Sequence, residues 1–263
     1  MNDPLVSVIY PVYNDLPEDI RLSLTSIVEQ DYQNLEIIII DDSTKPESIK
    51  AIDDFIFDKR LVVIRKLNKA GLAAALNCGL ELATGKYIAR ADADDIQRLN
   101  RIRKQVEFLE KNPQVGILGS NINYIDEKRG FVKERSYPAS HSEILKQIHL
   151  RNPFCHSVIM IRKSVLDTIG HYNPDFKRAE DYELWFRAAN KSINFSNLQE
   201  VLMDYKMATA SKRDDLNWKM NLKLKWNYFS VKYFITSSIG IASVIFYLYA
   251  PKSIQNFVYN KMA

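Results

Sequence analysis

Short apolar runs and helical spacings alternate along the first part of the chain. Runs rich in Val, Ile and Leu, each short enough for a covered strand, occupy residues 5–10, 35–40, 61–65 and 86–90. Between them, apolar residues recur at helical spacing after Asp19 and behind Pro46, and residues 72–83 are mainly good helix formers. This β-α-β-α-β-α-β order predicts a parallel sheet with helices on both faces.

The middle of the chain continues the mixed pattern. Residues 99–109 place their apolar side chains on one helical face, and Pro113 follows. Residues 115–119 and 157–161 are expected strands. Residues 179–189 form an expected helix that opens with Glu180 and Asp181.

The last part of the chain has a different character. Lys219, Lys223, Lys225 and Lys232 precede residues 233–250, which carry no charge. That stretch is at the lower limit of length for a membrane span, and its three serines and one threonine make it less apolar than a typical span. Basic residues interleaved with aromatic ones favour a helix in the anionic interface of a membrane. Residues 216–263 are therefore expected to form a helical membrane-associating tail, which either spans the membrane or lies on it.

The composition is that of a folded globular protein, with 46% hydrophobic and 26% charged residues. The net charge of +4 is too small to indicate nucleic acid as a partner. Cys78 and Cys155 lack metal-ligand spacing and favour a reduced, cytosolic setting. Acidic rather than basic residues precede the first apolar run, so we do not expect a secretory signal.

Polar residues gather at the carboxyl ends of three predicted strands. Residues 11–14, with the sequence PVYN, end the first strand; acids at positions 41 and 42 end the second; and acids at 92, 94 and 95 follow the fourth. In parallel α/β sheets, ligands bind beyond the carboxyl ends of the strands. The three polar groups are therefore expected to border one cleft.

The acids after the fourth strand repel one another unless a cation lies between them. An EF-hand loop starting at Asp92 would need Gly at its sixth position and Glu at its twelfth, where the chain has Gln97 and Arg103. Asp also favours turns and helix N-caps, and we expect Asp94 or Asp95 to cap the next helix. Neither role explains why acids end two neighbouring strands. Oxygen ligands without His or Cys favour Mg²⁺ or Mn²⁺ completed by substrate phosphates, and the chain has no glycine-rich phosphate loop to replace the metal.

Six ordered blocks of the sequence resemble those of family 2 inverting glycosyltransferases, which include bacterial enzymes of O-antigen and capsule synthesis. The blocks are VSVIYPVYN, IIIIDDST, GLAAALNCGL, ATGKYIARADADDI, NPFCHSVIMIRKSVLDTIGHYNPDF and AEDYELWFRA, within roughly residues 5–205. The resemblance implies the α/β GT-A fold, with a Rossmann-like, mostly parallel central sheet and helices on both faces. Residues 1–215 would form the glycosyltransferase domain, with a nucleotide-binding half at 1–100 and an acceptor-binding half at 101–215.

The resemblance also implies which residues bind the nucleotide. Tyr13 would pack on the uracil of a UDP-sugar, and Asp42, in preference to Asp41, would hydrogen-bond the base. Gly71 would let the backbone approach the nucleotide, and Arg90 would pair with the acids or with phosphate. The alternative role is a core aromatic for Tyr13, a loop glycine for Gly71 and a structural ion pair for Arg90. The other expected nucleotide contacts are Pro11, Asn14, Asp92 and Ala93.

The metal site implied by the resemblance consists of carboxylates. Asp92 would face the ribose and the metal, and Asp94 would ligate Mn²⁺ or Mg²⁺ on the donor diphosphate. Members of the family often carry YRxH after the base helix, with the histidine near the metal or diphosphate. Here residues 205–208 read YKMA, so metal binding would depend on the carboxylates and the diphosphate, or on another group.

Inverting transfer to a hydroxyl needs a proton acceptor opposite the leaving diphosphate. In AEDYELW, the resemblance assigns this base to Asp181, with Glu180 as the alternative base or as an acceptor contact. The structural alternative is that both acids only favour the N-terminus of their helix. His156 matches a family histidine near the acceptor, although a lone histidine is more often structural.

The resemblance, the acids and the tail predict a metal-dependent, inverting transferase that moves a hexose, Glc or Gal, from a UDP-sugar to a glycan hydroxyl with a β-linkage. The acceptor would be linked to a polyprenyl diphosphate, and the tail would hold the protein on the cytoplasmic face of the membrane. Two other functions stay open: a sugar-nucleotide nucleotidyltransferase, and a catalytically silent UDP-sugar-binding scaffold. The first lacks its glycine- and arginine-rich N-terminal loop, and the second is disfavoured by the intact acids.

Overall fold

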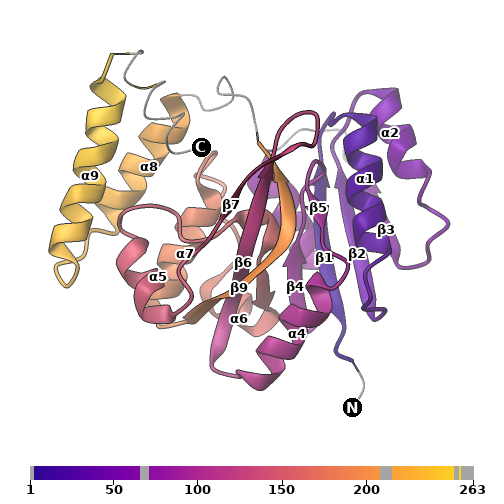
Figure 1. Cartoon of the computed structure of the whole chain (residues 1–263), viewed down its shortest axis with the longest axis horizontal. Coiled ribbons are helices and arrows are strands. Elements are labelled where there is room, and N and C mark those ends of the chain that lie inside the picture. The colour runs from indigo at the N-terminus through magenta and orange to yellow at the C-terminus, as the bar shows by residue number, and fades with distance from the viewer. Residues whose placement is uncertain (1–2, 66–70, 208–214, 252–254, 256–263) are drawn as a thin grey trace.

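The computed structural model describes residues 3–65, 71–207, 215–251 and 255 (Figure 1). The alanine that ends YKMA and most of the last twelve residues of the expected tail lie outside these ranges.

The first part of the chain follows the predicted alternation. Its strands are β1 (Val6–Val12), β2 (Leu35–Asp41), β3 (Leu61–Arg65) and β4 (Tyr87–Arg90), and its helices are α1 (Pro17–Val28), α2 (Pro46–Asp53) and α3 (Leu72–Leu82). β1 pairs in parallel with both β2 and β4, and β2 pairs in parallel with β3. The predicted parallel sheet is therefore confirmed for these strands.

The second part adds shorter and longer strands to the same sheet. The elements are β5 (Ile96–Gln97), α4 (Arg101–Lys111), β6 (Val115–Ile125), β7 (Phe131–Arg135), α5 (His141–Gln147), a 3₁₀ turn at His156–Val158, β8 (Met160–Arg162), α6 (Lys163–Ile169), α7 (Glu180–Asn190) and β9 (Asn194–Lys206). Within the described residues the sheet has nine strands in the order β3-β2-β1-β4-β8-β6-β9-β5, and β7 pairs with β6.

This second half of the sheet is mixed rather than parallel. β8 runs antiparallel to both β4 and β6, β5 runs antiparallel to β9, and β7 runs antiparallel to β6. Among the described residues of this half, only the long β6–β9 pair is parallel. β9 was not predicted because its sequence, NFSNLQEVLMDYK, lacks both a continuous apolar run and strict alternation.

Each face of the parallel strands has its own hydrophobic core, because alternate side chains point to opposite faces. Ile37 and Ile39 of β2 pack with Leu24 on the side of α1. Ile38 and Ile40 pack with Leu76 on the side of α3. Both faces are thus covered by helices, as the near-continuous apolar runs predicted.

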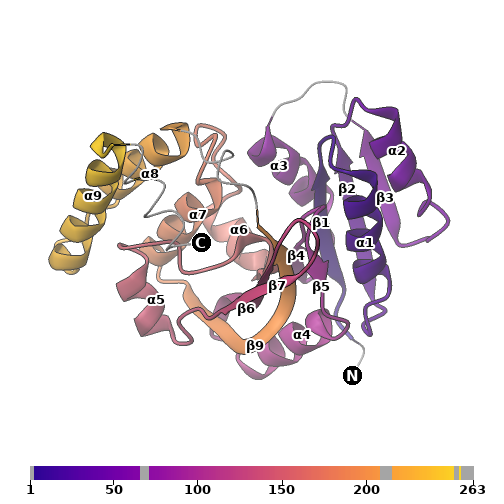
Figure 2. The ribbon, with the colours of Figure 1, turned by 45° about the horizontal axis from the view of Figure 1, so that its top comes forward.

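Helix α8 (Asp215–Asn227) packs on the side of α7, away from α1 and α2 (Figures 1 and 2). Leu224 is fully buried in the same core as Trp185, and the Tyr228 hydroxyl donates a 2.9 Å hydrogen bond to Glu183. Lys225, one of the lysines expected at an anionic membrane interface, instead points its side chain inward. It is 4% exposed, and its Nζ donates to the carbonyl oxygens of His149 and Leu150 at 2.8 and 3.1 Å.

Helix α9 (Phe234–Tyr249) lies beside α8 and has two unlike faces (Figure 2). Its inner face contacts His149, whose Nδ1 lies 3.1 Å from the Ser237 hydroxyl. A Cβ atom added at Gly240 would lie only 2.0 Å from the carbonyl oxygen of His149. The outer face exposes the large side chains of Phe234, Ile235, Ile239, Ile245, Phe246 and Tyr249. Within the described ranges, no helix has both the length and the apolar content that crossing a membrane requires.

Candidate active site

The ends of β1 and β2 are tied together by Asn14. Its φ of 56° places it in the left-handed region, which Asn tolerates better than most residues. Its Oδ1 accepts hydrogen bonds from the backbone N–H groups of Thr44 and Lys45 at 2.8 and 3.0 Å, and its own N–H donates to the Ser43 hydroxyl. Asn14 therefore fixes the two loops next to each other.

The neighbouring candidates differ in exposure. Tyr13 is 42% exposed, so its ring is not part of the core. Pro11 is buried within β1. Asp41 is buried and accepts from the Ser43 N–H at 2.9 Å, whereas Asp42 follows the end of β2 and donates its N–H to the Val12 carbonyl. Asp41 thus holds the turn that follows β2, and Asp42, which is also buried, is the first residue beyond the strand.

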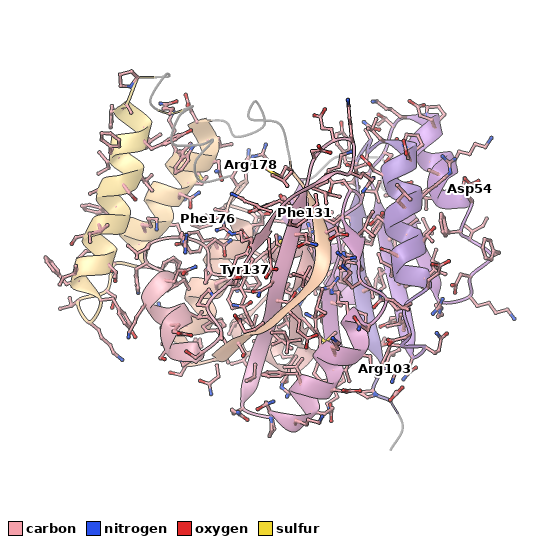
Figure 3. The ribbon with its side chains drawn as sticks, in the orientation of Figure 1. Asp54, Arg103, Phe131, Tyr137, Phe176 and Arg178 are labelled. Carbon is pink, nitrogen blue, oxygen red and sulfur yellow. The ribbon has the colours of Figure 1, made fainter. Side chains whose placement is uncertain are left out.

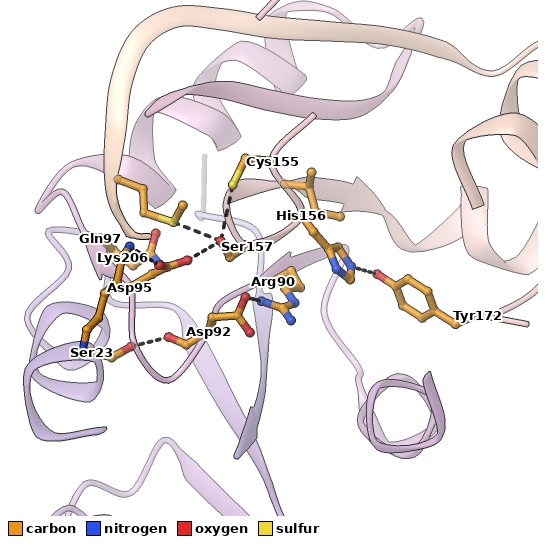
Figure 4. Close-up of polar contacts among 12 residues, drawn as sticks. Ser23, Arg90, Asp92, Asp95, Gln97, Cys155, His156, Ser157, Tyr172 and Lys206 are labelled. Carbon is orange, nitrogen blue, oxygen red and sulfur yellow. Dashed lines mark hydrogen bonds and ion pairs between the residues drawn. The ribbon is translucent and has the colours of Figure 1, made fainter. Parts of the chain in front are cut away.

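The three acids after β4 form one cluster. Asp92, Asp94 and Asp95 each offer a carboxylate oxygen, and these oxygens all lie within 4.8 Å of one another. Asp92 and Asp94 are half-buried, while Asp95 has no exposed surface. The Asp92 backbone carbonyl accepts a 2.6 Å hydrogen bond from Ser23 of α1, which holds the loop against that helix (Figure 4).

Asp95 is bound to the protein itself. Its carboxylate accepts from the Ser157 hydroxyl and, at 2.9 Å, from the backbone N–H of Lys206 (Figure 4). Burial raises the pKa of Asp95, and the charges of Asp94 and Asp92 raise it further. The expectation that Asp94 or Asp95 caps the next helix is wrong, because β5 intervenes and Asn100 is the N-cap residue of α4. Asp95 instead links the acidic loop to β9.

The cluster fits a hard divalent cation. Its donors are all carboxylate oxygens, which Mg²⁺ and Mn²⁺ prefer. Asp95 is already occupied by two hydrogen bonds from the protein, whereas Asp92 and Asp94 lie at the partly exposed side of the cluster. Asp92 and Asp94 are therefore the residues that would hold the ion.

Arg90 is the charged neighbour of this cluster. It is 3% exposed, and its Nη1 forms an ion pair with Asp92 (Figure 4). Burial opposes its charge, but the Asp92 carboxylate outweighs burial and raises the pKa of Arg90, so the guanidinium stays protonated. Ala93, between the two half-buried acids, is 4% exposed.

Gly71 starts α3 with a φ of 89°, a conformation that side-chain-bearing residues rarely adopt. A Cβ atom there would meet nothing within 4 Å, so the glycine is needed for the backbone turn rather than for space. The next residue, Leu72, borders the cavity described below.

A cavity of 850 Å³ joins the acidic loop to the N-terminus of α7. Arg90 and Asp92, at the end of β4, border it, and so do Glu180 and Asp181 of α7 and His156 of the 3₁₀ turn. Tyr137, which follows β7, and Arg178, which precedes α7, border it as well (Figure 3). Residues that are ninety positions apart in the sequence therefore share one space.

Glu180 and Asp181 begin α7 after Ala179, whose φ of 59° is unusual for a residue with a side chain. Asn152 donates a 2.6 Å hydrogen bond to Oδ2 of Asp181. Burial raises the pKa of Asp181, although hydrogen bonds from the Tyr182 N–H and Asn152 oppose the shift. Burial and the nearby charge of Asp181 also raise the pKa of Glu180. Both carboxyls are thus shifted toward neutral pH, as a proton acceptor requires.

His156 opens the 3₁₀ turn and lies against aromatic side chains. Its Nε2 is 2.8 Å from the Tyr172 hydroxyl, and its ring packs against those of Tyr172 and Trp185 (Figure 4). Burial, together with the charge of Arg90, lowers its pKa, so the imidazole is neutral at pH 7.

Asn152 was not singled out from the sequence, although it is the first residue of the NPFCHS block. Its role depends on a contact across 29 residues, which no local pattern reveals. YKMA contributes in another way than a histidine would: Lys206 donates its N–H to Asp95, its Nζ pairs with Asp19 at 2.6 Å, and Met207 borders the cavity.

The comparisons with known proteins agree with this geometry. Residues 7–170 match the model of Glycosyl transferase family 2. Two relatives from Escherichia coli are named as transferases to α-D-GlcNAc-diphosphoundecaprenol. The β-1,3-galactosyltransferase, with UDP-Gal in its name, is 28% identical over 98% of this chain and 96% of its own. The β-1,3-glucosyltransferase WfaP, with UDP-Glc in its name, is 32% identical over 79% of each chain.

Solved structures match the fold as well. S. aureus TarS residues 1–349, in complex with UDP, gives a TM-score of 0.69 at 18% identity, over 95% of this chain and 77% of that one. The mannosyltransferase PcManGT from Pyrobaculum calidifontis, in complex with GDP-Man and Mn²⁺, gives 0.66 at 18% identity, over 95% and 71%. The fold is thus that of the GT-A enzymes. The chain belongs to glycosyltransferase family 2 and is an enzyme of that class.

Proposed function

We propose that the protein transfers a hexose, Glc or Gal, from a UDP-sugar to a hydroxyl of a GlcNAc-type sugar linked to a polyprenyl diphosphate, with a β-linkage. The observation that carries the proposal is the single cavity bordered by both Asp92 and Asp181. A donor held at the acidic loop and a base at α7 can act on one substrate pair only if they share such a space. The names of the two E. coli relatives support the choice of donor and acceptor.

On the donor side, Tyr13 would stack on the uracil, and Asp42 would accept a hydrogen bond from the base. Asn14 and Asp41 act beneath them by fixing the loops. Asp92 and Asp94 would hold Mn²⁺ or Mg²⁺, which when bound neutralises the charge of the leaving diphosphate. Arg90 would keep Asp92 ionised and oriented, since the two side chains are paired.

On the acceptor side, an oxygen of Asp181 would take the proton of the attacking hydroxyl. The acceptor oxygen then bonds to the anomeric carbon while the bond from that carbon to the UDP oxygen breaks. The bond forms on the face opposite the one that breaks, so the configuration inverts. Asn152 donates to Oδ2 of Asp181 and would hold the carboxylate in place. The neutral ring of His156 would contact the acceptor sugar rather than transfer a proton, since its pKa is far below 7.

The outer face of α9 would attach the protein to the cytoplasmic face of the membrane, where a lipid-linked acceptor lies. Exposed apolar side chains on one face of a helix favour an interfacial position. In this proposal residues 1–215 form the catalytic domain, and the part from residue 216 onward supplies the membrane contact.

The experiment that tests the function measures UDP release from UDP-Glc and UDP-Gal, with GlcNAc-diphosphate-undecaprenol as the acceptor, in Mn²⁺ and in EDTA. We expect release with one donor that needs both acceptor and metal. Metal-dependent UDP binding without release from any donor and acceptor pair would instead favour a silent scaffold. Equal release in Mn²⁺ and EDTA would contradict the metal assignment.

A further inference from the structure

The wall of the cavity contains a group of basic side chains that the proposed chemistry does not use. They come from three different segments and are Lys133 and Arg135 of β7, Arg151 after α5 and Arg178 before α7. The donor diphosphate would be served by the metal at Asp92 and Asp94. The basic group therefore calls for a second anionic ligand.

Lys133 and Arg135 lie two residues apart on β7, so their side chains project from the same face of the strand. The Lys133 Nζ lies 5.6 Å from the centre of the Tyr124 ring, and the Arg135 Cζ lies 5.2 Å from that of Tyr137. These cation–π contacts hold both cations beside the cavity without neutralising them. Glu134, between them, is exposed and also borders the cavity.

Within the described residues, the charges of Lys133, Arg135 and Arg151 are not neutralised by ion pairs with acids. In the part of the chain that the structure describes, no carboxylate lies within 4.0 Å of the cationic groups of Lys133, Arg135 or Arg151. Other cations of this half of the molecule are paired, such as Arg129 and Lys206 with Asp19 and Arg187 with Glu183. Unpaired cations that border a cavity are an anion site, and the guanidinium groups suit phosphate oxygens because they can donate two parallel hydrogen bonds.

The position of the group indicates which anion it serves. The same cavity is bordered by Asn217, Trp218 and Asn221 of α8, and the Trp218 ring stacks on Tyr247 of α9 at 3.8 Å. The cavity thus extends from the acids of the donor site to the helices that carry the exposed apolar face. A lipid-linked sugar carries its diphosphate between the lipid and the sugar, so a cavity that joins Asp181 to α8 would also enclose that diphosphate.

We propose that Lys133, Arg135 and Arg151 bind the diphosphate that joins the acceptor sugar to its lipid. This assignment rests on the proposed function, because it names the part of the acceptor that the site recognises. Binding at this subsite would depend on charge and would need no metal. It would place the sugar of the acceptor next to Asp181 and would discriminate against the same sugar on an uncharged aglycone.

The test compares two acceptors that carry the same sugar, GlcNAc-diphosphate-lipid and GlcNAc on a neutral alkyl chain. Arg135→Gln and Arg151→Gln should each raise the KM for the diphosphate acceptor about tenfold, the loss typical of one charge-assisted hydrogen bond. Their KM for the neutral acceptor should stay unchanged, and Arg135→Lys should recover most of the loss. Arg21→Gln, on the far face of α1 where Arg21 pairs with Asp54, is the matched control. Equal losses with both acceptors, or no loss with either, would overturn the proposal.

A second measurement is independent of turnover and of the proposed reaction. Binding of farnesyl diphosphate in EDTA should be about tenfold weaker in Arg135→Gln than in the unsubstituted protein, and unchanged in Asp94→Asn. Weakening in Asp94→Asn alone would place the diphosphate at the donor acids and contradict the subsite. If farnesyl diphosphate did not bind the unsubstituted protein, the subsite would likewise be contradicted. If the protein uses neither acceptor but still shows Arg135-dependent binding of farnesyl diphosphate, the proposed function is wrong and the anion site stands.

Discussion

Asn152 donates a hydrogen bond of 2.6 Å from its side-chain amide to Oδ2 of Asp181. The bond connects the segment after α5 to the first turn of α7, and it stabilises the ionised carboxylate. Because it opposes the effect of burial, it lowers the pKa that Asp181 would otherwise have. The amide thus acts on the proposed base.

Replacement of Asn152 by Ala should therefore move the acid limb of the pH–rate profile to higher pH. The carboxylate loses a hydrogen bond to its charged form, so its pKa rises and a higher pH is needed to ionise it. The pH dependence of kcat/KM measures this shift. Asn190→Ala, at the exposed end of the same helix, should leave the profile in place. An unshifted profile in Asn152→Ala would show that the hydrogen bond does not tune the base.

Asp181→Asn should retain UDP-sugar binding and lose transfer by about 10²–10⁴-fold, the usual contribution of a general base. The amide has nearly the same shape and can no longer accept the proton. UDP binding by calorimetry and UDP release with acceptor are the two measurements. Glu180→Gln is the matched variant in the adjacent position, and a greater loss there than in Asp181→Asn would transfer the role of base to Glu180.

The acids at 94 and 95 should respond differently to the same substitution. Asp94→Asn should weaken Mn²⁺-dependent UDP binding while the fold is retained, because Asp94 is half-buried at the open side of the cluster. Asp95→Asn should instead lower the free energy of unfolding by about 1–3 kcal/mol, since Asp95 accepts hydrogen bonds from Ser157 and Lys206 inside the protein. Denaturant titration and UDP binding in Mn²⁺ and EDTA separate the two effects. Identical behaviour of the two variants would refute the division between a ligand and a structural acid.

Replacement of Ile235, Ile239 and Phe246 by Gln should release the protein from vesicles that contain anionic lipid. These side chains are 72%, 53% and 60% exposed on the outer face of α9, so the change removes apolar surface without disturbing the core. Co-sedimentation with the vesicles measures the loss. Phe57→Gln, at a residue 77% exposed elsewhere on the molecule, should have no effect. Unchanged sedimentation of the triple variant would contradict attachment through α9.

Stability should fall as the pH drops below about 6.5 because of His149. Burial, with a smaller contribution from the charge of Lys225, lowers the pKa of His149 to about 4. The unfolded chain therefore binds a proton that the folded chain excludes, and between pH 8 and pH 5 this difference costs about 2 kcal/mol. His149→Phe keeps the packing against Phe186 and Tyr233 and removes the titration. Denaturant titrations at both pH values should show a smaller loss in the variant, and equal losses would exclude His149 as the cause.

The sequence was sufficient for the parallel half of the fold because each strand there is a compact apolar run with helical spacing on both sides. It was not sufficient for β9, whose residues are held by pairing with β6 rather than by their own pattern. The acids at the strand ends could be assigned to one edge of the sheet because parallel topology brings carboxyl ends together, but of these acids only Asp92 borders the cavity. Asn152 and the basic group of the cavity could not be identified from the sequence, since their roles arise from contacts between segments distant in the sequence. Lys225 was misassigned because the sequence of the basic segment does not reveal that one of its lysines points inward to backbone carbonyls.

Gly240 has a consequence for the length of the acceptor. Because there is no room for even a methyl group between Gly240 and the His149 carbonyl, α9 packs directly on the backbone of the segment that leads to Asn152, the residue that donates to Asp181. A protein attached to the bilayer through the outer face of α9 would hold its base at a constant elevation above the lipid headgroups. Sugars close to the lipid anchor would reach the base, whereas those at the far end of a long oligosaccharide would extend past it. The enzyme would then add its hexose only at an early stage of assembly, while the glycan is still short.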